Sequence, residues 1–262
     1  MVEFATILFE SRALGIEHRW IGGHDSKPLV VFLHEGLGSV AMWKDYPDQL
    51  CAAAGTRGLV YSRPGYGRST RRPPGERWRP DFMHRQAFHV LPALLEALGV
   101  REPPFLFGHS DGGSIALLYA ARFRAAGVIA VAPHIVVEEF GLASIREART
   151  AYLEADLKAG LAKYHDDPDS AFWGWNDAWL DPAFASWSIE REIGTIACPL
   201  LAVQGVNDAY GTLEQVRGIA RRVAQTRLLV LPECGHSPHR EQPEALTREA
   251  AAFIHRRKET DA

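Results

Sequence analysis

The sequence predicts an α/β fold in which helices flank a mostly parallel sheet. Six short apolar segments of strand length alternate along the chain with segments that have helical spacing. Strands that are apolar at every position are typical of a sheet covered on both faces. Alternation of strands and helices favours parallel strands joined by crossover helices, and 262 residues are enough to bury a large core.

The elements are expected in a simple order. The predicted strands are 29–33, 58–61, 104–107, 127–132, 199–203 and 227–231. The predicted helices of this core are 42–54, 81–98 and 113–124. Pro92 predicts a kink or break in the second helix because proline has no backbone N–H to donate. Gly99 is suited to cap the end of that helix.

The interval 137–187 interrupts the alternation and is expected to form a helical cap, or lid, over a site. The core would then comprise residues 1–136 and 188–262. The interval has helical spacing over 145–163 and turn-forming residues at 166–169. Between Glu138 and Trp187, ten acids and four bases give a local charge near −6. Four of the seven tryptophans also lie there, at positions 173, 175, 179 and 187. These rings either line a pocket or attach the insertion to the core, and different rings can do either.

The overall composition excludes several classes of protein. Lys and Arg total 29 and Asp and Glu total 32, a net charge of −3, which disfavours a nucleic-acid partner. No apolar segment approaches the ~20 residues of a membrane helix, and the first ten residues lack the basic region of a signal peptide. Cys51, Cys198 and Cys234 are too few and too scattered for a disulfide framework or a zinc site. We therefore expect a cytoplasmic protein without a metal, a membrane or nucleic acid as partner; a homodimer is left open.

A glycine-rich hexapeptide lies between a predicted strand and a predicted helix. Residues 108–113, Gly-His-Ser-Asp-Gly-Gly, have the G-x-S-x-G pattern of a nucleophile elbow. Such a turn forces its central residue into strained backbone angles, and glycines on either side let neighbouring backbone approach. Ser110 is therefore the predicted nucleophile, at the carboxyl end of the sheet. A shift by one residue, to Asp111, is the alternative.

A serine hydroxyl needs a general base, and the base needs an acid to orient it. In this type of fold the order along the chain is serine, acid, histidine. Asp208 and His236 each follow a predicted strand, so both should converge on Ser110. His239 is the alternative base and Glu214 the alternative acid.

An oxyanion hole needs two backbone N–H groups directed at the developing negative charge. Asp111, directly after the nucleophile, should supply one of them. Gly36, in the loop after the first apolar strand, should supply the other. His34 and His109 flank these turns and are expected to form structural hydrogen bonds. The predicted substrate-binding residues are Trp173, Trp175, Trp179, His109 and Leu37.

On these residues the sequence resembles the α/β-hydrolase superfamily over nearly its whole length. The segments that carry the resemblance are 34–39, 62–69, 108–113, 205–208 and 235–236. The resemblance implies an eight-stranded, mostly parallel sheet with a lid after the sixth strand. It also implies a triad of Ser110, His236 and Asp208 that needs no cofactor. Similar members include esterases, thioesterases, lactonases and hydrolases of meta-cleavage ring-fission products.

Two positions depart from the pattern of that family. Members usually have glycine directly after the loop histidine, where this sequence has Glu35. We expect Glu35 to have a structural role with a partner for its charge. The alternative is that it faces the site, where it would repel an anionic substrate or perturb the base. The second departure is Ser237-Pro238 after the candidate histidine, where similar ring-fission hydrolases tend to carry an aromatic residue.

The segment from Arg63 to Arg85 holds seven arginines against Glu76 and Asp81, a local charge near +5. A solvated loop is the ordinary explanation. The alternative is a binding surface for a substrate carboxylate or for a phosphorylated carrier such as coenzyme A.

These observations together predict a serine hydrolase of the carboxylesterase or thioesterase type. Its small-molecule substrate would be an ester or thioester of a small aromatic or apolar carboxylic acid, cleaved through an acyl-enzyme. One alternative is a C–C bond hydrolase of ring-fission products that uses the same triad. Another is a non-catalytic receptor for a small ligand.

Overall fold

The computed structural model describes residues 1–23 and 26–260, so residues 24–25 and 261–262 of the predicted core lie outside the described range. One eight-stranded sheet has the order β1-β2-β4-β3-β5-β6-β7-β8. β2 pairs antiparallel with β1 and β4, and the strands from β4 to β8 pair parallel, which confirms the predicted sheet. The strands are β1 (Glu3–Phe9), β2 (Arg12–Ile21), β3 (Leu29–Leu33), β4 (Arg57–Tyr61), β5 (Phe105–His109), β6 (Gly127–Val131), β7 (Leu200–Gly205) and β8 (Thr226–Leu231).

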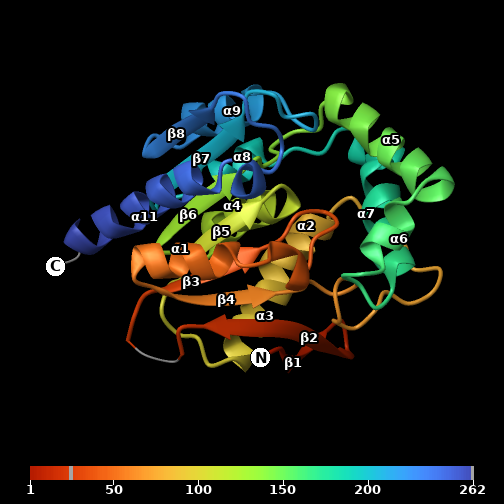
Figure 1. Cartoon of the computed structure of the whole chain (residues 1–262), viewed down its shortest axis with the longest axis horizontal. Helices are drawn as coiled ribbons and strands as arrows, with labels where there is room; N and C mark the ends of the chain where they lie inside the picture. Colours follow the sequence, from red (N-terminus) through yellow and green to blue (C-terminus); the bar gives the residue numbers. More distant parts are fainter. Residues whose placement is uncertain (24–25, 261–262) are drawn as a thin grey trace.

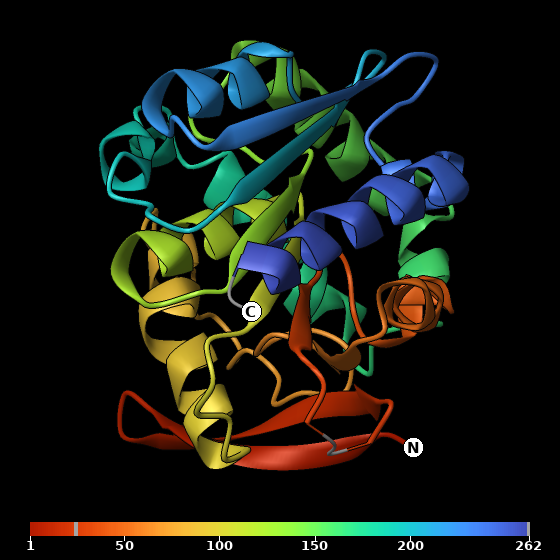
Figure 2. The ribbon, with the colours of Figure 1, turned by 90° about the vertical axis from the view of Figure 1, so that its left-hand side faces the viewer.

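Helices cover both faces of the sheet (Figure 1 and Figure 2). Successive side chains of a strand point to opposite faces. Val31 of β3 accordingly joins one hydrophobic cluster, and Phe32 joins a second one. The first cluster includes residues of α3 (Leu91–Ala97), α4 (Asp111–Arg122), α8 (Glu190–Ile193) and α9 (Glu214–Arg222). The second includes residues of α1 (Tyr46–Ala54) and α11 (Pro243–Thr260).

The helical segment before β5 is interrupted, as Pro92 predicts. α2 (Phe82–Arg85) continues into a π-helical turn, Gln86–Val90, and only then into α3. Pro92 lies in the first turn of α3, where a missing N–H costs least. Gly99 follows the helix with a positive φ of 70°, the backbone conformation that glycine adopts most easily.

The expectations about the strands are incomplete at one edge of the sheet and wrong at the other. β1 and β2 do not belong to the six apolar segments because both carry charged residues; in β1, buried and exposed positions partly alternate. The expectation that each predicted strand is covered on both faces is wrong for β8. Leu228 and Val230 of β8 each remain 39% exposed because this strand is the last of the sheet.

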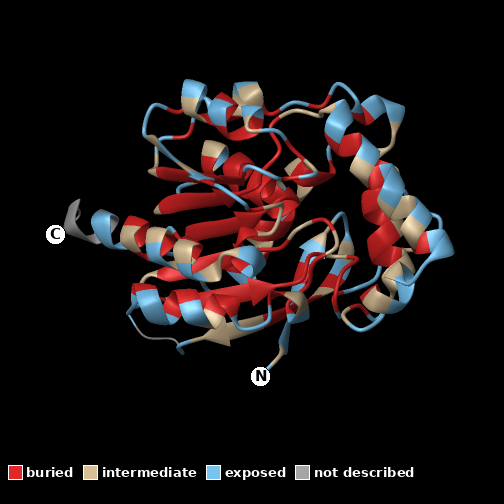
Figure 3. Ribbon diagram, turned by 45° about the horizontal axis from the view of Figure 1, so that its top comes forward, coloured by how far each residue is buried: buried red, intermediate tan, exposed pale blue. Residues whose placement is uncertain are grey.

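The chain between β6 and β7 leaves the sheet and forms a separate group of helices. This group comprises α5 (Glu139–Glu154), α6 (Leu157–Leu161), α7 (Pro168–Trp179) and the short turn η3 (Pro182–Phe184). It stands at one side of the sheet in Figure 1. Figure 3 shows exposed residues on its outer side and buried residues on its inner side. The aromatic stretch after 169 is thus helical. Two further short helices are η1 (Ala41–Trp43) and α10 (Pro238–Glu241).

Among the described residues, no helix combines the length and apolar character that crossing a membrane requires.

Candidate functional site

Ser110 occupies a sharp turn between β5 and α4. Its backbone angles, φ 54° and ψ −121°, are rare for a residue with a side chain and indicate local strain. Neighbouring backbone leaves no room for a side chain at the two glycines that flank this turn. A Cβ at Gly108 would lie 2.1 Å from the carbonyl oxygen of Gly112, and one at Gly112 would lie 2.0 Å from that of Leu33. The turn therefore presents Ser110, 7% exposed, at the end of the central strand.

Asp208 and His236 form a close acid–imidazole pair. His236 Nδ1 lies 2.9 Å from both carboxylate oxygens of Asp208. A carboxylate can only accept, so Nδ1 carries the hydrogen and Nε2 is left as the basic nitrogen. Gln204 Nε2 and the backbone N–H of Tyr210 also donate to Asp208, at 2.6 and 2.8 Å. Burial raises the pKa of Asp208, but the bonds from His236 and Tyr210 outweigh burial and hold that pKa below its usual value.

The loop that carries His236 is held against the elbow. His109, next to Ser110, places Nε2 2.7 Å from the carbonyl oxygen of His236, and the two imidazole rings lie 5.0 Å apart. On the other side, Glu241 accepts hydrogen bonds from the backbone of Gly235 and Ser237, at 2.6 and 2.9 Å. The structure thus brings the histidine loop and the serine turn together.

The two alternative residues lie elsewhere. His239 is buried behind His109, with its ring 5.0 Å from that of Trp43. Burial lowers the pKa of His239 well below its usual value, and neither ring nitrogen has a hydrogen-bond partner among the described residues. Glu214 is exposed on α9, where it pairs with Arg217 and Arg221.

The loop after β3, which contains Gly36, is fixed by a buried arginine. His34 Nε2 accepts from the backbone N–H of Arg63 at 3.0 Å, and Nδ1 lies 2.7 Å from the carbonyl oxygen of Glu35. His34 is therefore neutral with its hydrogen on Nδ1. This agrees with its pKa, which burial and the charge of Arg63 lower well below the usual value. The guanidinium of Arg63 also lies 3.7 Å from the Asp111 carboxylate, and both side chains are fully buried.

The three predicted pocket tryptophans have different surroundings. A Cβ at Gly36 would lie 2.2 Å from Nε1 of Trp175, so this indole lies directly on the predicted oxyanion loop. Trp179 donates from Nε1 to Asp111 at 3.1 Å and so fastens α7 to the elbow. Trp173, two residues from Trp175 on α7, packs against Tyr152 of α5 with the ring centroids 5.5 Å apart, and its place in a substrate pocket stays a prediction.

Leu37, in the loop after β3, contacts the segment that leads into α7. Its carbonyl oxygen is 2.9 Å from Nε2 of His165, and Nδ1 of the same ring accepts from the N–H of Gly67 at 2.9 Å. His165 lies just before α7, so it ties the inserted helices to two loops of the core. Burial lowers the pKa of His165.

Glu35 has partners for its charge. Its carboxylate lies 3.2 Å from the guanidinium of Arg240 and 3.6 Å from Nδ1 of His109. Burial raises the pKa of Glu35, but His109, His239 and Arg240 overcome this effect and hold the pKa well below its usual value. The side chain is therefore a carboxylate between two basic groups.

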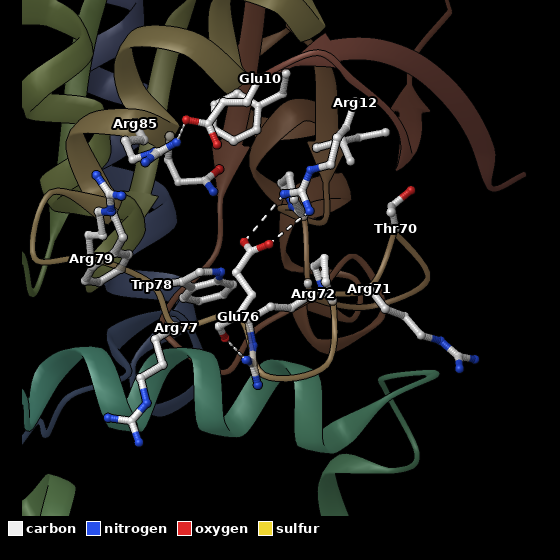
Figure 4. A pocket seen from close by; sticks show the side chains of 17 residues that line it. Glu10, Arg12, Thr70, Arg71, Arg72, Glu76, Arg77, Trp78, Arg79 and Arg85 are labelled. Carbon is white, nitrogen blue, oxygen red and sulfur yellow. Dashed lines mark hydrogen bonds and ion pairs between the residues drawn. The ribbon is translucent and has the colours of Figure 1, made fainter.

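The arginine-rich segment divides into a buried and an exposed part. Arg63 belongs to the buried site, so it is not part of a solvated loop. Most of the others line a cavity of about 330 Å³ beside Trp78 (Figure 4). There Arg12 is paired with Glu76 at 2.9 Å, and Arg85 is paired with Glu10. Arg71, Arg77 and Arg79 are exposed, and within the described part of the chain no acidic partner is found for them.

Several residues of this site were missed by reasoning from the sequence. The buried His134, after β6, has its ring 6.1 Å from that of His236. Burial and the proximity of His236 lower its pKa to about 3. The ring of Tyr210 lies tilted against the imidazole of His236, with the centroids 4.7 Å apart, and Gln204 donates a hydrogen bond to Asp208. The sequence signal that they share is their position. Each is a polar residue at or just beyond the carboxyl end of an apolar strand, the edge of the sheet at which the residues of this site lie.

Within residues 1–23 and 26–260, no group of three or more His, Cys, Asp or Glu side chains is arranged to hold a metal ion.

Known proteins resemble this chain in sequence and in fold. The model of the Alpha/beta hydrolase family matches residues 30–249. A proline iminopeptidase from Lactobacillus helveticus is 30% identical over 112 residues, which are 42% of this chain and only 36% of that protein. An esterase from Thermogutta terrifontis has a TM-score of 0.76 at 22% identity, over 98% of this chain and 99% of its own. The meta-cleavage product hydrolase from Pseudomonas fluorescens IP01 has a TM-score of 0.72 at 18% identity, over 96% and 97%. These two solved structures share the fold.

Proposed function

The chain belongs to the alpha/beta hydrolase family, and we propose that within it the protein is a serine hydrolase of esters or thioesters. Ser110 is the proposed nucleophile, His236 the general base and Asp208 the acid that orients it. The observation that carries the proposal is the pair of 2.9 Å contacts from His236 Nδ1 to Asp208, in a loop bonded to the residue next to Ser110.

The proposed reaction has two steps. Ser110 Oγ attacks the acyl carbon while its proton passes to His236 Nε2. The bond to the leaving oxygen or sulfur then breaks, and the leaving group takes that proton. Water, deprotonated by His236, attacks the acyl-enzyme and releases the carboxylic acid. Asp208 stabilises the imidazolium in both steps, and the N–H groups of Gly36 and Asp111 are the proposed donors to the oxyanion.

The substrate class is proposed from the surroundings of Ser110. We propose that residues 137–187 form a cap over the site. Its helices contribute the indole of Trp175 beside Gly36. The rings of Trp179 and His134 meet edge to face, with their centroids 4.9 Å apart. Apolar rings favour a small aromatic or apolar acyl group over a charged one.

Ser110→Ala is the direct test. Turnover of p-nitrophenyl esters and acyl thioesters should fall by several orders of magnitude with the melting temperature unchanged. A fluorophosphonate should label the wild-type protein at Ser110 and leave the variant unlabelled. Wild-type protein that is never labelled would favour a receptor. Turnover of a vinylogous diketone in preference to the esters would favour C–C bond hydrolysis of a ring-fission product; one structural neighbour is named a meta-cleavage product hydrolase.

A further inference from the structure

We propose that Glu35 is a positioning residue of this site: it holds His109, which holds the backbone of His236 beside Ser110. The inference rests on the proposed function and deepens it.

The contacts form one continuous path through three loops. The Arg240 guanidinium lies 3.2 Å from Glu35 Oε1, and Glu35 Oε2 lies 3.6 Å from His109 Nδ1. His109 Nε2 then lies 2.7 Å from the carbonyl oxygen of His236. The loop after β3, the serine turn and the histidine loop are far apart in the chain, and this path joins all three.

The direction of each hydrogen bond fixes what Glu35 can do. A carbonyl oxygen only accepts, so His109 must keep a hydrogen on Nε2 to bond His236. Its other nitrogen, Nδ1, is buried and has no hydrogen-bond partner within 3.5 Å among the described residues. The nearest opposite charge is the Glu35 carboxylate. The path therefore requires a hydrogen on each ring nitrogen. As an imidazolium, His109 points Nδ1–H at the Glu35 carboxylate and donates from Nε2–H to His236, whereas a neutral ring would turn the Nδ1 lone pair toward the carboxylate.

Burial makes this attraction effective. The side chain of His109 is 1% exposed and that of Glu35 is 15% exposed, so solvent screens their interaction only weakly. His239 and Arg240 are the other basic groups that face Glu35. The loop is also shaped around the carboxylate: a Cβ at Gly38 would lie 2.5 Å from Glu35 Oε2. Any side chain at position 38 would push Glu35 out of this position.

Glu35→Gln removes the charge and keeps the shape. We expect kcat for p-nitrophenyl acetate to fall about tenfold with KM within about twofold, because a displaced base lowers the chemical step more than binding. The matched control is Glu249→Gln, a half-buried glutamate of α11 that pairs with Arg227 of β8 and lies outside the path; kcat should stay within about twofold. In a background of His109→Gln, the Glu35→Gln change should have no further effect on kcat.

Two additional measurements separate positioning from simple stability. The low-field proton NMR signal of the His236 Nδ1–H bonded to Asp208 should shift or broaden in Glu35→Gln and remain in Glu249→Gln. A variant with a lower melting temperature but wild-type kcat and an unchanged signal would overturn the proposal. Additive losses in Glu35→Gln and His109→Gln would overturn it as well. Failure of the fluorophosphonate to label wild-type Ser110 would instead overturn the proposed function, and the positioning role with it.

Discussion

Two regions of this molecule are rich in charge, and they are built in opposite ways. Around Ser110, Arg63 and Asp111 are fully buried. Arg63 donates to the carbonyl oxygen of Glu35, Asp111 accepts from Trp179, and the two charged groups lie 3.7 Å apart. In the cavity of Figure 4, the guanidinium of Arg12 meets Glu76 with side chains 40% and 37% exposed. Figure 4 also shows Arg71 and Arg77 extending away from that cavity.

The two regions differ in how much each charge contributes to the stability of the fold. An exposed ion pair adds about 0–1 kcal/mol to stability because water competes for both partners. A buried charge that loses its partner costs about 3–5 kcal/mol because no water replaces the partner. We therefore expect substitutions around Ser110 to affect activity or folding strongly, and substitutions in the cavity to have small, salt-dependent effects.

The largest effect is expected from Asp208→Asn. The carboxylate of Asp208 is 1% exposed and selects the imidazole tautomer that leaves His236 Nε2 free. An amide at this position favours the wrong tautomer, and kcat should fall by about 10⁴-fold. Glu76→Gln, an acid in the exposed cavity, is the matched control and should leave kcat unchanged. Equal losses in the two variants would contradict the contrast between the regions.

Arg63→Leu should have the next largest effect, on folding. The variant leaves the Asp111 carboxylate buried with only the indole of Trp179 as donor, and it removes the bond to the Glu35 carbonyl oxygen. The free energy of unfolding in urea should drop by about 3–5 kcal/mol. Adding Asp111→Asn should recover part of this loss, since the unpaired charge is then gone. A loss under about 1 kcal/mol would show that water reaches the pair.

Much of the fold could be predicted from local pattern, but less of the site could be. Strands such as Val30 to Leu33 are apolar throughout because both faces are covered, so composition alone reveals them. β1 and β2 at one edge carry charges and have no such pattern. The residues of the proposed triad follow strand ends, which makes their convergence predictable. The partnership of Glu35 with Arg240 spans 205 positions, and no local signal specifies it.

The next prediction concerns His165. This side chain is buried, like Arg63 and Asp111 around Ser110, but it is uncharged. Its pKa lies below the ordinary 6.5 because of burial, while the unfolded chain keeps that value. As pH falls below 6.5, only the unfolded chain takes up the proton, so stability is lost until the folded pKa is reached. One such histidine contributes at most about 1 kcal/mol between pH 6.5 and 5.5, the limit for a folded state that takes up no proton in this range.

His165→Gln should therefore flatten the pH dependence of the free energy of unfolding, by no more than that limit. Urea unfolding at both pH values measures it, and replacement of the exposed His89 is the control. An identical pH slope in wild type and His165→Gln would contradict the burial argument. The buried His34, His134 and His239 act in the same direction, so the comparison uses the difference between variants.

The smallest effect is expected in the cavity. The triple change of Arg71, Arg77 and Arg79 to Gln should alter the free energy of unfolding by less than about 0.5 kcal/mol, because these side chains are exposed. It should lower kcat/KM for an ester with an anionic acyl group a few-fold at about 0.01 M salt, where charges act over ~30 Å. At about 1 M salt that range is ~3 Å, and the difference should vanish. A neutral ester serves as the control, since its kcat/KM should be independent of these arginines. If kcat/KM for neither ester changes, these arginines belong only to a solvated loop, and the contrast between the two regions becomes sharper still. An equal fall for both esters would contradict electrostatic attraction of the substrate.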